Sequence, residues 1–343
     1  ADTQVGTRAV DREVDSVCPY CGVGCQISYK IRDGEIAYVE GRDGPANENR
    51  LCVKGRFGFD YVSNPERLTK PLIRRENAPK GLNIDPANPL THFREASWDE
   101  ALTRAAAGLN RIRKQHGGRA IAGFGSAKGS NEEAYLFQKL IRQAFGTNNV
   151  DHCTRLCHAS SVAALMEGIG SGAVTAPFTD ALLADVIIVI GANPTENHPV
   201  AATYFKQAAK NGARLIVMDP RGHALRKHAS DLVQFRPGSD VALLNAMMHV
   251  IVAEKLYDEQ YIQAHTEGFD RLSAHLARYT PEAMAPVCGI EAGRIRELAR
   301  AYAQAERAMI FWGMGVSQHS HGTDNARCLI SLALMTGHVG RPG

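Results

Sequence analysis

Four cysteines near the N-terminus are spaced for metal binding. Cys18, Cys21 and Cys25 lie in one short loop that contains two glycines, and Cys52 follows much later. Four thiolates suit either an iron–sulfur cubane or a structural zinc ion. Zinc sites usually present two Cys-x2-Cys pairs, whereas here three cysteines are together and one is remote. The spacing therefore favours a [4Fe–4S] cluster over zinc.

Two further features could take part in redox chemistry. Lys54 lies two residues after Cys52 and therefore beside whatever the cysteines bind, although alone it is typical of a solvated surface lysine. Cys157 and His158 are adjacent where a strand is expected to lead into a helix. A thiolate at a helix start can be a nucleophile or a soft metal ligand, and a histidine can move protons near neutral pH. In isolation, however, such a pair is more typical of a buried cysteine beside a packing histidine.

Local signals predict the elements that position the N-terminal residues. Alternating residues at 26–31 and 35–39 flank Asp33-Gly34, which predicts a hairpin within a β-rich segment at 14–40. Residues 64–97 are rich in Pro, Asn and Arg and indicate a long connection. Ser97 and Glu100 predict a capping box at the start of a helix with one apolar face, which Gly117-Gly118 ends. A strand at 120–124 and a helix at 131–145 are then expected.

The second half of the chain alternates strands with helices. Strands are predicted at 185–190, 214–218 and 308–312, and helices at 200–210, 241–254, 295–305 and 324–336. A buried strand, a crossover helix and a second buried strand form a βαβ unit, so we expect an open parallel α/β sheet.

Composition narrows the function classes. The chain has 343 residues, which suggests about two or three domains, and its 44% hydrophobic and 22% charged residues are typical of a globular protein. Nearly balanced charges, 39 basic against 36 acidic residues, argue against a dedicated nucleic-acid binder. No apolar run approaches the length of a membrane span. Without a secretory signal, the clustered cysteines indicate a metal site rather than a disulfide framework.

The order of the motifs is more specific than any one of them. Between Val14 and Gly343 the chain carries, in order, Cys18-Pro-Tyr-Cys-Gly-Val-Gly-Cys25, Leu51-Cys-Val-Lys-Gly-Arg56, Arg155-Leu-Cys-His158, Gly191-Ala-Asn-Pro-Thr-Glu-Asn-His-Pro199, Met218-Asp-Pro-Arg221, Gly238-Ser-Asp240 and Trp312-Gly-Met-Gly-Val-Ser-Gln318. This series resembles the catalytic subunits of molybdenum or tungsten formate dehydrogenases, in the molybdopterin-dinucleotide oxidoreductase superfamily. The cytosolic NAD-dependent type is the most similar.

The resemblance implies roles for the redox residues. Cys157 matches the protein ligand of the metal, and His158 matches the histidine that follows this ligand in formate dehydrogenases. Lys54 matches a lysine on the electron path between the cluster and a pterin. Cys153 departs from the nitrate-reductase branch, which carries asparagine at that position. A second thiol near the metal or a buried spectator would both explain it.

The resemblance also implies that loops at the carboxyl ends of parallel strands hold two molybdopterin guanine dinucleotides. Arg221 suits a bidentate phosphate contact, and Asp240 suits hydrogen bonds from a guanine edge. Without the resemblance, each of these positions is an ordinary turn or cap residue. The expected pterin contacts, besides Lys54, are Gly191, Asn193, Glu196, Asp219, Arg221, Gly238, Asp240, Met314 and Gln318.

The implied fold class is α/β, with a small β-rich iron–sulfur domain before Rossmann-like parallel-sheet domains. We expect the [4Fe–4S] domain at 1–70, the first part of an α/β domain at 71–150, and the dinucleotide-binding domain at 151–343. The family's catalytic subunits continue beyond a segment like Gly340-Arg-Pro-Gly343. That continuation carries a formate-binding arginine, a second half-domain and a barrel, so we expect a fragment or a split subunit.

The implied activity is oxidation of formate to carbon dioxide at a bis-pterin molybdenum or tungsten centre. Electrons would leave past Lys54 through the cluster to iron–sulfur and flavin subunits that reduce NAD in the cytoplasm. One alternative is a nitrate reductase, in which histidine does not follow the ligand cysteine. Another is a non-catalytic electron-transfer subunit like that of respiratory NADH dehydrogenase. The Cys157-His158 pair and the dinucleotide loops argue against it.

Overall fold

A computed structural model of the chain describes residues 9–81, 88, 90–174 and 176–343. Residue contacts divide it into two units. The first contains the described residues up to Arg32, together with Ala37–Arg56 and Thr154–Gly343, and the second contains Asp33–Ile36 and the described part of Phe57–Cys153. Of the connection expected over 64–97, residues 82–87 and 89 lie outside the described residues, as do the first eight residues of the chain.

A three-stranded sheet carries the cysteine loop. Its strands are β1 (Arg12–Val17), β2 (Gln26–Arg32) and β3 (Glu35–Gly41), in the order β1-β2-β3. The hairpin predicted at Asp33-Gly34 is confirmed, and both residues have positive φ, 53° and 80°. Val17 and Gln26 are paired across β1 and β2. The cysteine loop therefore connects two paired strand ends, which restrict its shape.

The large sheet is parallel, as predicted. It consists of β8 (Val186–Ile190), β9 (Arg214–Met218), β10 (Asp231–Val233) and β11 (Ala308–Trp312), in the order β10-β9-β8-β11. Ile190 pairs with both Met218 and Trp312, so three strands end at the same level. The loops that follow them therefore begin together at one edge of the sheet.

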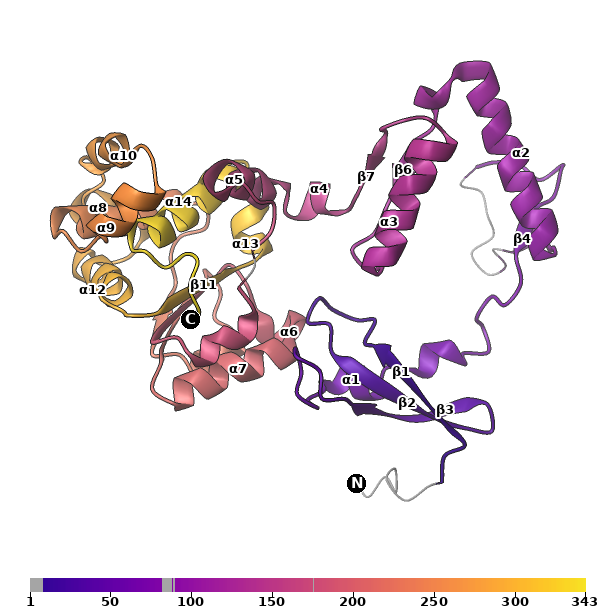
Figure 1. The fold of residues 1–343 in the computed structure, drawn as a ribbon, viewed down its shortest axis with the longest axis horizontal. Coiled ribbons are helices and arrows are strands. Elements are labelled where there is room, and N and C mark those ends of the chain that lie inside the picture. The colour runs from indigo at the N-terminus through magenta and orange to yellow at the C-terminus, as the bar shows by residue number, and fades with distance from the viewer. Residues whose placement is uncertain (1–8, 82–87, 89, 175) are drawn as a thin grey trace. The chain divides into compact units, whose positions relative to one another are not determined.

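Helices cover both faces of this sheet, as Figure 1 shows. On β8, Val186 and Ile188 pack in a core with α8, α12 and α14, whereas Ile187 and Val189 pack in a second core with α7. Side chains of a strand alternate between its two faces, and both faces here are buried. The helices in these layers are α7 (Pro199–Lys210), α8 (Asp240–Ala253), α12 (Ala292–Ala303) and α14 (Gly322–Met335).

Shorter helices complete the first unit. They are α1 (Val53–Phe57), α4 (Thr154–Cys157), α5 (Ala159–Ile169), α6 (Pro194–Asn197), α9 (Glu259–His265), α10 (Phe269–Leu276), α11 (Pro281–Cys288) and α13 (Met314–Ser317). Helix α5 packs on α14 through a small core that includes Ala164, Leu165, Ala326 and Ile330. This contact joins two segments that are far apart in the sequence. Together, the sheet and its helices confirm the predicted α/β fold class.

The second unit contains two helices and two short sheets. Its elements are α2 (Trp98–His116), α3 (Asn131–Lys139), β4 (Leu72–Arg74), β5 (Phe93–Glu95), β6 (Gly123–Phe124) and β7 (Val150–Asp151). Ser97 caps α2 by accepting a hydrogen bond of 3.1 Å from the backbone N–H of Glu100. The Glu100 carboxylate pairs with Arg94 instead of returning to Ser97, so only half of the predicted capping box forms. The predicted apolar face of α2 contains no buried residue.

Two predicted elements are shorter in the structure. The strand expected at 120–124 is confined to Gly123–Phe124, because Gly118–Ala120 forms a 3-10 turn. A Cβ on Gly118 would lie 2.4 Å from the carbonyl oxygen of Phe145, so a larger residue could not make this turn. The helix expected at 131–145 is α-helical only to Lys139 and is a π-helix over Leu140–Ala144. In the described part of the chain, every helix is too short or too polar to cross a membrane.

Candidate redox cofactor site

The four N-terminal cysteines line one cavity of about 170 Å³. The backbone N–H of Cys18 donates to the carbonyl oxygen of Cys25 at 2.8 Å, which closes the loop at its base. Cys52 comes from the segment just before α1. The fold thus brings together the three adjacent cysteines and the remote one, as the spacing predicts.

The cavity is unfavourable for four free thiolates. Burial, together with the neighbouring charges of Cys18, Cys21 and Cys52, raises the pKa of Cys25 to about 12. Positively charged iron would offset this repulsion, because the metal binds the deprotonated thiolates. Within the described ranges, no three Cys, His, Asp or Glu side chains converge closely enough to hold a single metal ion.

Lys54 lines the same cavity as the cysteines. It is the second residue of α1, and its side chain is exposed. Residues of α6 and α7 complete the lining, among them Asn197 and Val200. The structure therefore places Lys54 between the cysteine loop and solvent.

Sequence reasoning missed the contact that anchors the cysteine segment. The guanidinium of Arg50 lies over the ring of Tyr204, 4.3 Å from its centroid, and also donates to Gln207 at 3.4 Å. Both partners belong to α7, on the parallel sheet. An arginine over a desolvated aromatic ring is a favourable cation–π pair. Arg50 lies two residues before Cys52, but no pattern in the sequence links it to Tyr204.

Three expected acidic and amide side chains are buried at the carboxyl edge of the large sheet. Asn193 follows β8, Asp219 follows β9, and Asp240 begins α8. Asp219 accepts a hydrogen bond of 2.8 Å from the backbone N–H of Arg221, which shapes the loop after β9. Asp240 is only 2% exposed, and its Oδ2 atom has no hydrogen-bond partner among the described residues. Burial raises the pKa of Asp240.

An unsatisfied buried carboxylate is costly, so a native protein normally supplies it with a donor. The Asp240 carboxylate therefore fits a ligand that presents N–H groups, as a guanine edge does. The three expected residues Asn193, Glu196 and Arg221 line one neighbouring cavity of about 340 Å³. His223 and Arg226, which the sequence analysis did not single out, line it as well. Both residues follow the Met218-Asp-Pro-Arg221 motif closely, and this position in the sequence is the signal that could have identified them.

Two expected glycines act through the backbone. Gly191 has φ of +57°, and a Cβ there would lie 2.8 Å from the carbonyl carbon of Gly315. The loops after β8 and β11 therefore touch through their backbones. Gly238 has φ of +80° in the turn before α8, a conformation that favours glycine. Met314 is 47% exposed at the start of α13.

Cys157 and His158 lie between two helices. Cys157 is the last residue of the one-turn helix α4, and His158 is the N-cap residue of α5. The sequence predicts the thiol at a helix start, whereas α5 begins two residues after it. The side-chain amide of Gln318 donates to the carbonyl oxygen of Leu156 at 3.2 Å. The tertiary structure thus brings Gln318 to the Cys157 segment.

His158 also contacts α13, next to Gln318. Its Nδ1 atom lies 3.0 Å from the hydroxyl oxygen of Ser317. Burial lowers the pKa of His158, which favours the neutral ring. Cys153 is exposed, with its sulfur 3.9 Å from Nδ1 of His152. It is therefore not the buried spectator considered from the sequence.

Comparison with protein families identifies the family to which this chain belongs. Residues 67–343 match the molybdopterin oxidoreductase family, and residues 11–64 match the molybdopterin oxidoreductase Fe4S4 domain. The chain belongs to the molybdopterin oxidoreductase family. Its expected cofactors are confirmed by these two domains: a [4Fe–4S] cluster and a molybdenum or tungsten molybdopterin. The four-cysteine cavity and the unpartnered Oδ2 atom of Asp240 fit these groups.

Several relatives in this family are formate dehydrogenases. The chain is 40% identical over 336 residues to formate dehydrogenase H of Escherichia coli, and the match covers 96% of the chain and 45% of the relative. It is 39% identical over 331 residues to the alpha subunit of an F420-dependent formate dehydrogenase of Methanocaldococcus jannaschii, with 96% and 46% covered. The chain thus spans about half the length of the relatives it matches.

A solved structure shows the same fold. Acetylene hydratase from Pelobacter acetylenicus superposes with a TM-score of 0.83 at 22% identity, covering 96% of this chain and 44% of that one. At this identity the likeness concerns the fold alone. It supports the α/β fold class predicted from the sequence.

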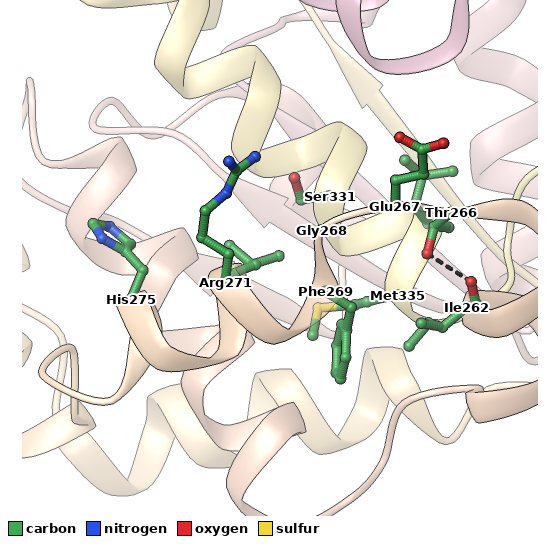
Figure 2. Close-up of a pocket in the computed structure, with 11 residues that line it drawn as sticks. Ile262, Thr266, Glu267, Gly268, Phe269, Arg271, His275, Ser331 and Met335 are labelled. Atoms are coloured by element: carbon green, nitrogen blue, oxygen red, sulfur yellow. Dashed lines mark hydrogen bonds between the residues drawn. The ribbon is translucent and has the colours of Figure 1, made fainter.

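A separate cavity of about 440 Å³ lies among α9, α10 and α14 of this molybdopterin oxidoreductase chain (Figure 2). Its lining includes the polar side chains of Arg271 and His275 from α10 and Ser331 from α14, and the apolar side chains of Phe269 and Met335. Thr266 donates back to the carbonyl oxygen of Ile262 at 2.8 Å, which closes the end of α9. None of the site residues expected from the sequence lines this cavity.

Proposed function

We propose that this chain forms the cofactor-binding part of a formate dehydrogenase, which oxidises formate to carbon dioxide. The observation that carries the proposal is the Cys157-His158 pair, held by Gln318 and Ser317 beside the carboxyl edge of the sheet. Relatives at 39–40% identity are named formate dehydrogenases. The reaction releases two electrons and one proton for each formate anion.

Each residue of the pair has a distinct role in this proposal. The Cys157 thiolate is the soft ligand that would hold the metal. When bound, the molybdenum or tungsten pterin would accept the two electrons of formate. His158 would lie beside the reacting carboxylate, where a ring nitrogen can orient the substrate or handle its proton. Gln318 would keep the ligand segment in place through its bond to Leu156.

The loops at the sheet edge would hold the dinucleotide parts of the cofactor. Asp240 would accept N–H donors of a guanine edge, because its buried Oδ2 atom lacks a partner among the described residues. Arg221 would contact phosphate, since its side chain is 79% exposed. Its Nε atom lies 3.8 Å from Oδ1 of Asp219, which is a long contact for an ion pair. Asn193 and Glu196 line the same cavity as Arg221. Glycines 191 and 238, Met314 and Gln318 would shape the remaining contacts.

Electrons would leave through the four-cysteine cluster. Lys54 lines the cluster cavity, and its positive charge would stabilise added electrons nearby. We further propose partner subunits that carry iron–sulfur and flavin groups, NAD as the final acceptor, and a cytoplasmic location. The F420-dependent relatives are named as alpha subunits, which supports a multi-subunit enzyme.

The test is formate-dependent reduction of benzyl viologen by the full-length catalytic subunit that contains this chain, purified anaerobically with its cofactors. Cys157→Ala should reduce turnover by at least about a hundredfold, because the metal loses its protein ligand. Cys153→Ala, which removes an exposed thiol four residues away, is the matched control and should keep near wild-type turnover. X-ray absorption should show one fewer sulfur around the metal in the Cys157 variant alone. Full activity of Cys157→Ala, or nitrate-driven viologen oxidation without formate oxidation, would reject the proposal.

A further inference from the structure

A chain of hydrogen bonds leads from the sheet to His158. The indole Nε1 of Trp312 donates to the hydroxyl oxygen of Ser161 at 2.9 Å. That oxygen lies 2.6 Å from the hydroxyl oxygen of Ser317, which lies 3.0 Å from Nδ1 of His158. Ser161 and Ser317 are only 5% and 4% exposed. These residues come from β11, α5 and α13, so tertiary packing alone aligns them.

The hydrogen bonds in this series all point in one direction, from Trp312 toward His158. Trp312 can only donate, because an indole nitrogen has no free lone pair. Ser161 receives that hydrogen, and the hydroxyl of Ser317 is the one acceptor that the described contacts offer for its own hydrogen. If Ser317 donated to Ser161 instead, a buried hydroxyl hydrogen of Ser161 would have no acceptor there, which is unfavourable.

The direction continues to the imidazole. With one hydrogen bond accepted from Ser161, Ser317 can donate to His158 Nδ1 at 3.0 Å or to the carbonyl oxygen of Gly313 at 3.4 Å. The shorter contact has the better hydrogen-bond length. Trp312 therefore donates to Ser161, Ser161 to Ser317, and Ser317 to His158, and each hydrogen bond polarises the next.

We propose that Ser317 is a positioning residue that donates to His158 Nδ1 and so keeps the ring hydrogen on Nε2. Nδ1 is then an acceptor toward the protein. The N–H at Nε2 can then donate to a bound ligand. This inference rests on the proposed function, in which that ligand is formate.

The tautomer has a chemical consequence. An Nε2–H group can donate to a carboxylate oxygen, which only accepts when ionised. It has no lone pair to remove a proton. His158 in this state therefore orients formate and does not act as the base at Nε2.

Imidazole ¹⁵N chemical shifts test the tautomer without any measurement of activity. The protein is labelled with ¹⁵N-histidine, and His158→Gln identifies the resonances of that ring. We expect the wild type to show a protonated Nε2 and an unprotonated Nδ1. Ser317→Ala should shift a substantial fraction of the ring to the other tautomer. A wild-type ring protonated at Nδ1, or an unchanged tautomer in Ser317→Ala, would overturn the proposal.

Two further variants sharpen the test. Ser160→Ala is the matched control, since Ser160 is on the same helix and bonds only the backbone oxygen of Ser317, at 2.6 Å. It should leave the tautomer unchanged. Ser161→Ala removes the donor to Ser317 but keeps the contact between Ser317 and His158, so it should give an intermediate shift. If Ser317→Ala fails to fold, the Ser161→Ala variant tests the same hydrogen-bond series.

Kinetics separate this proposal from the proposed function. Ser317→Ala should lower kcat/KM for formate about tenfold, the effect of one weakened hydrogen bond, and Ser317→Thr should restore most of it. Full formate oxidation by His158→Gln would refute the role of His158 in the reaction but leave the tautomer result standing. An inactive His158→Gln with an unchanged tautomer in Ser317→Ala would refute only the positioning role.

Discussion

Gly191 and Gly315 approach each other so closely that neither has room for a side chain. A Cβ on Gly315 would lie 2.7 Å from the Cα of Gly191, and the backbone N–H of Gly315 donates to the carbonyl oxygen of Gly191 at 3.0 Å. The contact joins the loop after β8 to the loop after β11. It therefore sets where Ser317 and Gln318 meet the Cys157-His158 segment.

The first prediction concerns this contact. Gly315→Ala should lower the free energy of unfolding by about 1–3 kcal/mol, because the new methyl group meets backbone atoms that cannot rotate away. Gly293→Ala in α12 is the control, since a Cβ there meets nothing within 4 Å. That helical substitution should be neutral or slightly stabilising. Denaturant midpoints measure both, and equal midpoints would contradict the close approach.

The second prediction concerns the cysteine cavity. Anaerobic preparation should give about four irons per chain, as a cubane requires. Cys25→Ala should lose most of this iron, because it removes one of four thiols that line a shared cavity. Cys153→Ala should keep it. Iron and zinc analysis measures the result, and stoichiometric zinc without iron would refute the cluster assignment.

The third prediction concerns Lys54. Lys54→Ala should slow reduction of the cluster more than reduction of the metal centre, because a positive charge next to the cluster cavity is lost. Lys54→Arg keeps the charge and should behave more like the wild type. Rapid mixing with formate, followed at wavelengths for each centre, separates the two steps. Identical cluster rates in wild type and Lys54→Ala would exclude the role.

The fourth prediction concerns Asp240. Asp240→Ala should purify with markedly less pterin dinucleotide, because the ligand loses a buried acceptor worth about tenfold in affinity. Asp270→Ala removes an exposed carboxylate in α10 and should keep the wild-type content. Extraction and quantification of the pterin gives the occupancy directly. Equal pterin content in both variants would mean that Asp240 does not contact the cofactor.

The fifth prediction concerns acid stability. Burial alone would raise the pKa of Asp231, but hydrogen bonds from Arg214 and Arg294 outweigh it and lower the pKa below the ordinary 3.8. Because the pKa is lower in the folded state, the ionised Asp231 stabilises the fold above pH 3.8. This stabilisation is lost as the pH falls through the folded pKa.

Asp231→Asn should therefore be less stable than the wild type at neutral pH, by about 1–3 kcal/mol. The difference should shrink as the pH falls below 3.8, where the carboxyl of the unfolded chain is protonated first, and should be lost as the pH falls through the lower folded pKa of Asp231. Denaturation at a series of pH values checks this. A difference that stays constant down to pH 2 would show that the charge of Asp231 does not contribute.

Local patterns predicted much of the fold. The apolar runs at 186–190, 214–218 and 308–312 became three strands of the parallel sheet because both faces of such a strand must be buried. Short-range signals such as Asp33-Gly34 and Ser97 also succeeded, since a turn or cap depends on a few neighbouring residues. The strand expected at 120–124 failed because the close approach of Gly118 to Phe145 is a tertiary contact.

The sequence by itself determined which chemistry is available: four cysteines in a three-plus-one spacing, a Cys-His pair, and glycine-rich loops after apolar strands. Side-chain type and short spacing are local properties, and they can be read along the chain. Only the tertiary structure decided that Ser317 meets His158 and that the Oδ2 atom of Asp240 is buried without a partner among the described residues. Ser317 and His158 are 159 residues apart, and their contact depends on how α5 and α13 pack together beside the sheet.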